Sequence, residues 1–235
     1  MPRTKITGTD ADDILDGTTG DDRILGLGGV DEIRGGKGAD RIEGGEGDDL
    51  LEGQKGADVL IGDAGADRMF GGNGRDAMIW NNGDGSDLMD GGAGVDTAVA
   101  NGSDEAGDVF AIRGNAGIPG GVLSERTNFG PFTLDIRNTE ILEVNGGGGD
   151  DAVDASALEA GLVELRVNGG AGADEIRGSQ GADTLKGGKG DDFIEGQGGD
   201  DLLKGGKGAD LLVGDQGDDA MFGGKGADVM VWNNG

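Results

Sequence analysis

A nine-residue period dominates this sequence between Gly35 and Ile79. Cut every nine residues, the stretch reads GGKGADRIE, GGEGDDLLE, GQKGADVLI, GDAGADRMF and GGNGRDAMI. Each unit follows the pattern Gly-Gly-x-Gly-x-Asp-x-apolar-x, and a period held this strictly predicts a repeat architecture. The glycines allow sharp turns, the aspartate contributes carboxylate oxygens, and the apolar residue contributes to a narrow core.

The units fall into two blocks. Eight run without a gap from Gly8 to Ile79, Trp80 and Asn81 interrupt, and two more end at Val99; a second block opens at Gly146 and continues as seven units from Gly169 to Val231. We therefore predict three regions, namely a first repeat block (1–99), a central non-repeat β segment (100–145), and a second block (146–235) with a detour at 155–168. GGNGRDAMIWNNG at 71–83 resembles GGKGADVMVWNNG at 223–235, so we expect the natural protein to continue further.

The central segment has a different pattern. Apolar and polar residues alternate at 108–113, 121–126, 132–137 and 140–144, between turns rich in Gly, Pro and Asn. Such runs are typical of short strands. Three of the six phenylalanines lie here, which predicts the largest conventional core of the chain. The pattern leaves open whether this segment continues the coil or forms a small β unit by itself, and we favour continuation.

Composition excludes several classes of function. The chain has 56 glycines, no cysteine, no histidine and a net charge of -28. Disulfides, thiolate sites and imidazole-based metal sites or catalysis are therefore excluded. Strong acidity argues against nucleic-acid binding, and no apolar run approaches the length of a membrane span. The first residues lack the apolar core of a secretory signal peptide.

The repeat pattern predicts a site for a hard cation. Aspartate carboxylates and backbone carbonyls exposed by glycine turns are oxygen ligands, which suit calcium better than magnesium because calcium accepts irregular cages of six to eight oxygens. We predict several Ca²⁺ ions. The predicted aspartate ligands are Asp22, Asp31, Asp40, Asp49, Asp58, Asp67, Asp76, Asp87, Asp96, Asp151, Asp174, Asp183, Asp192, Asp201, Asp210, Asp219 and Asp228. The turn glycines expected to shape the cages are Gly35, Gly36, Gly38, Gly44, Gly45, Gly47, Gly187, Gly188, Gly190, Gly205, Gly206 and Gly208.

The period also predicts the architecture. Nine residues make a turn and a short strand, so two units make one coil, and units n and n+2 stack on the same side at about 4.8 Å. The predicted fold is all-β, a parallel β-roll or β-solenoid in which ions lie between vertically adjacent turns. Ordering nine residues costs about 9–18 kcal/mol against roughly 2 kcal/mol from one buried aliphatic side chain. We therefore expect the repeat blocks to be disordered without calcium.

At these residues the chain resembles the RTX, or hemolysin-type calcium-binding, repeat proteins of Gram-negative bacteria. Gly35–Ile79 and Gly187–Val231 match the GGxGxDxUx motif of that family almost unit by unit. The resemblance implies a parallel β-roll with calcium in the turns, and export by type I secretion to the cell exterior. Units that depart from the motif, such as those containing Ala11 and Thr18, are expected to bind weakly or to act as caps.

Our main functional prediction is a non-enzymatic, calcium-binding structural module that folds after export, expected to be a monomer. Two alternatives remain open: an adhesin or matrix protein that binds a surface or a glycan through the central segment, and the repeat region of a larger exported toxin or hydrolase. The position-three lysines are expected to stack in columns that neutralise acidic turns, with a partner site as the alternative. Position-five acids are expected to be solvated, and Trp80 and Trp232 to cover the flank of a coil.

Overall fold

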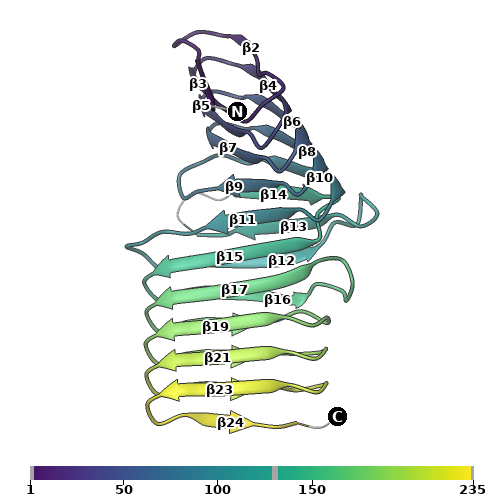
Figure 1. The fold of residues 1–235 in the computed structure, drawn as a ribbon. Helices are drawn as coiled ribbons and strands as arrows, with labels where there is room; N and C mark the ends of the chain where they lie inside the picture. The colour runs from purple at the N-terminus through teal and green to yellow at the C-terminus, as the bar shows by residue number, and fades with distance from the viewer. Residues whose placement is uncertain (1–2, 129–131, 234–235) are drawn as a thin grey trace. The chain divides into compact units, whose positions relative to one another are not determined.

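A computed structural model of the protein describes residues 3–128 and 132–233, and every regular element in these ranges is a β-strand (Figure 1). The predicted all-β parallel β-solenoid is confirmed. No helix in the described part of the chain is long and apolar enough to cross a membrane. The predicted region limits at positions 1 and 235, and Phe129 of the central segment, lie outside the described residues.

The chain forms two compact units, and each consists of two sheets. Unit 1 comprises Met1–Ala100 and Phe132–Ile141. Its first sheet contains, in order, β1 (Thr4–Thr7), β3 (Asp22–Gly28), β5 (Arg41–Glu46), β7 (Val59–Ala64), β9 (Ala77–Trp80) and β11 (Thr97–Asn101). Its second sheet contains β2 (Ile14–Asp16), β4 (Glu32–Lys37), β6 (Leu50–Gly56), β8 (Arg68–Gly74), β10 (Leu88–Gly94) and β14 (Phe132–Arg137).

Unit 2 comprises Asn101–Pro131 and Leu142–Gly235. Its first sheet contains β15 (Ile141–Gly148), β17 (Glu164–Ala171), β19 (Thr184–Lys189), β21 (Leu202–Lys207) and β23 (Ala220–Lys225). Its second sheet contains β13 (Val122–Arg126), β12 (Val109–Gly114), β16 (Ala152–Ala157), β18 (Glu175–Arg177), β20 (Phe193–Glu195), β22 (Leu211–Val213) and β24 (Val229–Val231).

Alternate strands of the sequence pair in parallel, as the period predicts. Ile24 is in register with Ile42, and Ile42 with Leu60, so one coil takes eighteen residues. The same register links Leu185 to Leu203 in unit 2. Each coil therefore places its two nine-residue units in opposite sheets, and equivalent positions stack along each unit.

The core consists of the eighth-position side chains, stacked in columns. In unit 1 one column contains Ile33, Leu51, Met69 and Met89, all fully buried. Neighbouring strand positions face outward, because side chains alternate between the two faces of a strand. The core is thus one side chain deep on each sheet, and the turns must contribute the rest of the stability.

The central segment extends the coils. Strand β14 continues the second sheet of unit 1, with Ile136 in register with Met89, and β12 pairs in parallel with β16 in unit 2. Strand β13 returns antiparallel to β12 and departs from the solenoid pattern. In unit 1 the ring of Phe132 stacks on Trp80 at 3.7 Å between centroids. Trp80 is fully buried, so the expectation that it covers a flank is wrong, whereas Trp232 is 58% exposed.

Candidate metal centre

The sixth-position aspartates form four continuous rows. In each row the backbone N–H of one aspartate donates to Oδ1 of the aspartate in the next coil, at 2.7–3.2 Å. The rows of unit 1 are Asp13, Asp31, Asp49, Asp67, Asp87 and Asp22, Asp40, Asp58, Asp76, Asp96. Those of unit 2 are Asp108, Asp151, Asp174, Asp192, Asp210, Asp228 and Asp183, Asp201, Asp219. One oxygen of each interior carboxylate therefore holds adjacent coils together.

The second carboxylate oxygen, Oδ2, is left without a partner within the protein. It is buried and makes no hydrogen bond in thirteen aspartates: Asp31, Asp40, Asp49, Asp58, Asp67, Asp76, Asp87, Asp96, Asp151, Asp174, Asp192, Asp201 and Asp210. Buried polar atoms in folded proteins are normally hydrogen-bonded, since an unsatisfied one costs about 1–3 kcal/mol, and more when it is charged. Unpaired carboxylate oxygens repeated in this way fit a cationic partner.

A backbone cradle lies beside twelve of these oxygens, and the unit of Asp87 begins with Asn82 in place of the first glycine. A Cβ placed on Gly44 would lie 2.4 Å from Oδ2 of Asp49 and 2.7 Å from the carbonyl oxygen of Gly62 in the next coil. The equivalent point at Gly205 lies 2.3 Å from Asp210 Oδ2 and 2.6 Å from the Gly223 carbonyl. In these twelve units the first residue is glycine, and a side chain there would fill the cradle. The same arrangement recurs at Gly35, and at Gly187 with respect to the Asp192 carboxylate.

The other two glycines of a unit set the backbone conformation of the turn. Second-position glycines have φ of 104–128° and fourth-position glycines φ of 124–135° at the predicted sites, where L side chains are strained. These residues are Gly36, Gly45, Gly188 and Gly206, and Gly38, Gly47, Gly190 and Gly208. Positive φ is what allows the turn to curl around the carboxylate.

Burial strongly perturbs the carboxylates. Desolvation raises the pKa of Asp58 to about 7 and that of Asp67 to about 8, and the hydrogen bond from the preceding coil opposes the shift. In unit 2 the same causes, in the same order, raise the pKa of Asp201 to about 8. Neighbouring aspartates in the row add like-charge repulsion. Without a cation these turns therefore favour the protonated form, and a divalent ion would compete with those protons.

The donor set suits calcium. Within the described ranges no three Asp or Glu side chains gather around one point, so each cradle offers carboxylate oxygen together with backbone carbonyls. Position-five acids are exposed, in agreement with the prediction that they are solvated, and they also accept backbone hydrogen bonds. Asp48 accepts the backbone N–H of Ala66, and Asp191 that of Ala209, so these carboxylates bridge successive coils.

Several predicted ligands differ from this interior geometry. Asp22 and Asp183 are buried, but hydrogen bonds from Thr18 and Ser179 already satisfy their carboxylates. Asp219 and Asp228 are only half-buried.

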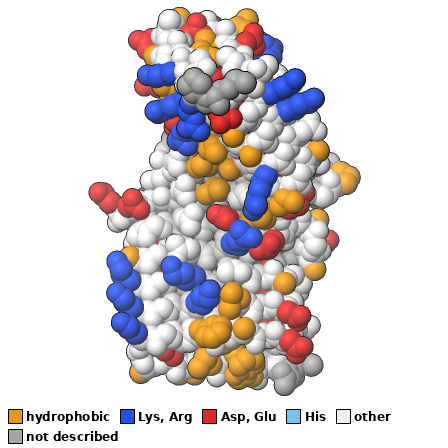
Figure 2. Space-filling view, viewed as in Figure 1, with side chains coloured by type: hydrophobic (Ala, Val, Ile, Leu, Met, Phe, Trp, Pro, Cys, Tyr) orange, Lys and Arg blue, Asp and Glu red, His pale blue; other side chains and the backbone are white. Residues whose placement is uncertain are grey.

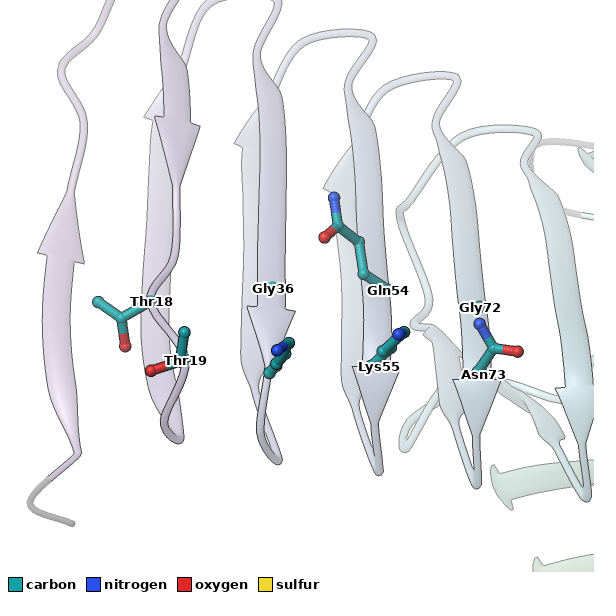
Figure 3. Close-up of a pocket in the computed structure, with 8 residues that line it drawn as sticks. Thr18, Thr19, Gly36, Gln54, Lys55, Gly72 and Asn73 are labelled. Carbon is teal, nitrogen blue, oxygen red and sulfur yellow. The ribbon is translucent and has the colours of Figure 1, made fainter.

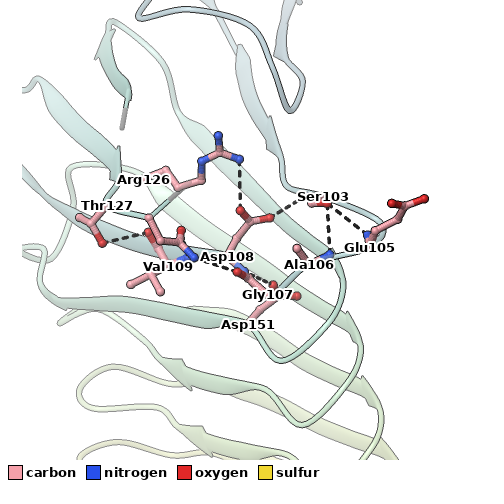
Figure 4. Close-up of polar contacts among 10 residues, drawn as sticks. Ser103, Glu105, Ala106, Gly107, Asp108, Val109, Arg126, Thr127 and Asp151 are labelled. Atoms are coloured by element: carbon pink, nitrogen blue, oxygen red, sulfur yellow. Dashed lines mark hydrogen bonds and ion pairs between the residues drawn. The ribbon is translucent and has the colours of Figure 1, made fainter. Parts of the chain in front are cut away.

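The sequence pattern missed Asp108. An insertion before it breaks the period, yet its N–H donates to Asp151 Oδ1 at 2.7 Å, and Arg126 forms a buried ion pair with its Oδ1 at 3.1 Å (Figure 4). Glu140 was also missed; its Oε2 accepts the Asp96 N–H at 2.8 Å. The signal for Asp108 was the Gly102–Ser103 pair ahead of it, which repeats the start of a unit.

Unit 1 also has a shallow hollow of about 510 Å³ over the turns of its second sheet (Figure 3). Second- and third-position residues of successive coils line it: Thr18, Thr19, Gly36, Lys37, Gln54, Lys55, Gly72 and Asn73. It contains none of the buried carboxylates, so it is separate from the cradles.

Fold and site together define a parallel β-solenoid with a carboxylate-and-carbonyl cradle in its turns. The model of the RTX calcium-binding nonapeptide repeat matches residues 7–42, 43–78, 83–104, 168–203 and 195–230. Because these matches span more than half of the chain, the chain belongs to that family. None of the curated proteins matches the chain.

Proposed function

We propose that this chain is a calcium-binding structural module whose folding depends on calcium. The observation that carries the proposal is the set of thirteen buried carboxylate oxygens without a hydrogen-bond partner, twelve of them beside a glycine cradle. The predicted aspartates with this geometry would hold the ions, and the turn glycines would admit them. Calcium supplies the positive charge that these oxygens lack.

Energetics support coupling between binding and folding. A buried charge without a partner costs several kcal/mol in a real protein. Repeating that cost in adjacent coils, with a core one side chain deep, disfavours the folded chain unless a cation is bound. Binding free energy then becomes folding free energy.

Export gives this coupling a purpose. We propose that the chain is synthesised in a Gram-negative bacterium, leaves by type I secretion while unfolded, and folds as a monomer in the calcium-rich exterior. Family membership supports export in general, since proteins with these repeats are usually exported. The thirteen aspartates with a free Oδ2 repeat one arrangement and none of them is singled out, which supports a structural role without catalysis.

The test is a calcium titration of chelator-treated protein, followed by far-UV circular dichroism and tryptophan fluorescence. We expect a cooperative coil-to-β transition with calcium and none with magnesium at the same concentration. Burial of Trp80 against Phe132 should shift its emission to the blue in the same transition. A spectrum that is already β-rich in chelator and unchanged by calcium would refute calcium-dependent folding.

A lysine-rich face of unit 2 favours a second candidate function, binding of an anionic glycan. Lys189, Lys207 and Lys225 are in register on β19, β21 and β23, and Lys186 is in register with Lys204 (Figure 2). All five lysine side chains are exposed. In the described part of the chain every ion pair within 4.0 Å involves arginine. These lysines therefore form no direct ion pair with an acidic side chain.

The geometry of this face suits a linear polymer. A column of glycines (Gly188, Gly206, Gly224) lies between the two lysine columns, so this strip of the face carries no side chains. Successive lysines in a column are one strand spacing apart. Thirteen divalent ions would carry 26 positive charges and reduce the net charge of -28 to -2. The protein's own negative charge would then no longer repel an anionic glycan from this face. We therefore locate glycan binding here, and not in the central segment.

Dextran sulfate, with uncharged dextran as the matched control, tests this second function in saturating calcium. Lys204→Glu with Lys207→Glu should weaken binding at least tenfold, while Lys37→Glu with Lys55→Glu in unit 1 should not. Equal binding of single-stranded DNA, or equal loss in both double variants, would contradict a glycan site on this face. Circular dichroism in calcium shows whether each variant is folded.

A further inference from the structure

The repeat units fall into two conformational kinds, which the residue at the second position distinguishes. In the units whose aspartate keeps a free Oδ2, that residue has positive φ, whether it is glycine or one of Leu27, Gln54, Asp63 and Gln197. Four units carry Ser or Thr instead, at Thr9, Thr18, Ser103 and Ser179, and none of these has positive φ. A β-branched or hydroxylated residue resists the left-handed conformation and bonds locally.

In these four units the second residue itself satisfies the aspartate. Its backbone N–H donates to Oδ2 of Asp13, Asp22, Asp108 or Asp183, at 2.6 Å in every case. The hydroxyl adds a second bond in three of them, at 2.9 Å from Thr9, 3.1 Å from Thr18 and 2.8 Å from Ser179. In the fourth, Arg126 provides the second contact (Figure 4).

All four of these units lie at the start of an aspartate row. Asp13, Asp22, Asp108 and Asp183 are the first members of the four aspartate rows within their units. An interior aspartate receives an N–H on Oδ1 from the preceding coil, and a first aspartate has no such donor in its row. The Ser or Thr therefore satisfies a carboxylate that would otherwise lack both of its partners.

We propose that Ser or Thr at the second position closes a unit to calcium, and that these four residues give each aspartate row an end that needs no metal. The closed unit keeps the carboxylate and its contact to the next coil, but a backbone N–H lies on the oxygen that would bind the ion. At Asp108 the guanidinium of Arg126, 5% exposed, supplies the positive charge as part of the chain.

This proposal rests on the proposed calcium-binding function and assigns which units carry it out. Open units, with positive φ at the second position, take the ions. Closed units are the fixed ends on which the calcium-dependent coils stack. The second-position residue, and not the aspartate, then determines whether a unit binds a calcium ion.

The test counts bound calcium by isothermal titration in Ser179 variants of the full chain. Ser179→Gly should open the unit and add one calcium ion relative to wild type. Ser179→Ala should add none, because alanine, unlike glycine, meets a steric cost at positive φ and so keeps its N–H on Asp183 Oδ2. Ser156→Gly, which removes a serine outside the repeat units, is the matched control and should also add none.

An unchanged count in Ser179→Gly, or an added ion in Ser179→Ala, would overturn the proposal. If wild type binds no calcium, the proposed function fails on its own. Hydrogen exchange then still tests whether the Ser179 N–H closes its unit. The Ser179 N–H of wild type should exchange at least tenfold more slowly than the backbone N–H at the same position in Ser179→Gly. Equal exchange would show that the closed conformation does not exist.

Discussion

Replacement of Asp58 by Asn should change stability in opposite directions with and without calcium. Asp58 lies in the middle of its row, with Oδ1 accepting the Asp40 N–H at 2.8 Å and Oδ2 buried without a partner. Asparagine keeps the shape and one acceptor oxygen while removing the charge. Asp48, whose carboxylate is at the exposed edge of a turn, provides the matched control as Asp48→Asn.

The magnitude without calcium follows from the raised pKa. A pKa of about 7 instead of 3.8 corresponds to about 4 kcal/mol at 1.36 kcal/mol per unit, of which we retain half, about 2 kcal/mol, for solvent screening. Asp58→Asn should therefore stabilise the metal-free fold by about 2 kcal/mol at pH 8. In calcium at 100–1,000 times its dissociation constant, loss of one site should cost about 3–4 kcal/mol.

The assay is chemical denaturation followed by circular dichroism. In calcium, urea should unfold Asp58→Asn at a lower midpoint than wild type, and Asp48→Asn should stay close to wild type. In chelator, where the chain is expected to be unfolded, the osmolyte trimethylamine oxide should fold Asp58→Asn at a lower concentration than wild type. Destabilisation of equal size in both conditions would refute the reasoning, since the carboxylate would then act only as a hydrogen-bond acceptor.

Three further predictions concern pH, the cradle and the buried aromatic pair. Because burial raises the pKa of Asp67 to about 8, the metal-free fold should be most stable below about pH 4 and lose stability as pH rises through about 8, whereas the stability of the calcium-bound fold should stay level between about pH 5 and pH 8, since the aspartates are ionised in both the unfolded and the calcium-bound chain; a parallel loss in chelator and in calcium would contradict proton–calcium competition. Gly26→Ala places a methyl group 2.2 Å from a carboxylate oxygen and should remove one calcium from the titration, while Gly117→Ala, with nothing nearer than 3.5 Å, should remove none. Phe132→Ala should destabilise the calcium form by about 3–5 kcal/mol in urea and shift Trp80 emission to the red; unchanged emission would mean that the stacked pair does not form in solution.

The regular part of the fold and of the site could be predicted from the sequence alone. A coil of eighteen residues puts Ile24 beside Ile42 and Asp40 beside Asp58, since strand pairing and aspartate contacts in the regular coils join residues one coil apart. Periodicity therefore predicts the pairing of strands, the core columns and the aspartate rows together. The absence of His and Cys then limits the metal to a hard cation.

The irregular parts were decided by the tertiary structure. Asp108 joins a row through a hydrogen bond to Asp151, 43 residues away, and Arg126 contacts it from an antiparallel strand. Neither contact occurs at the repeat spacing, so the period does not predict them. The burial of Trp80 depends in the same way on Phe132, beyond a long insertion. A repeat fixes only the contacts that recur at its own period, and contacts at any other separation depend on where the folded chain brings the residues together.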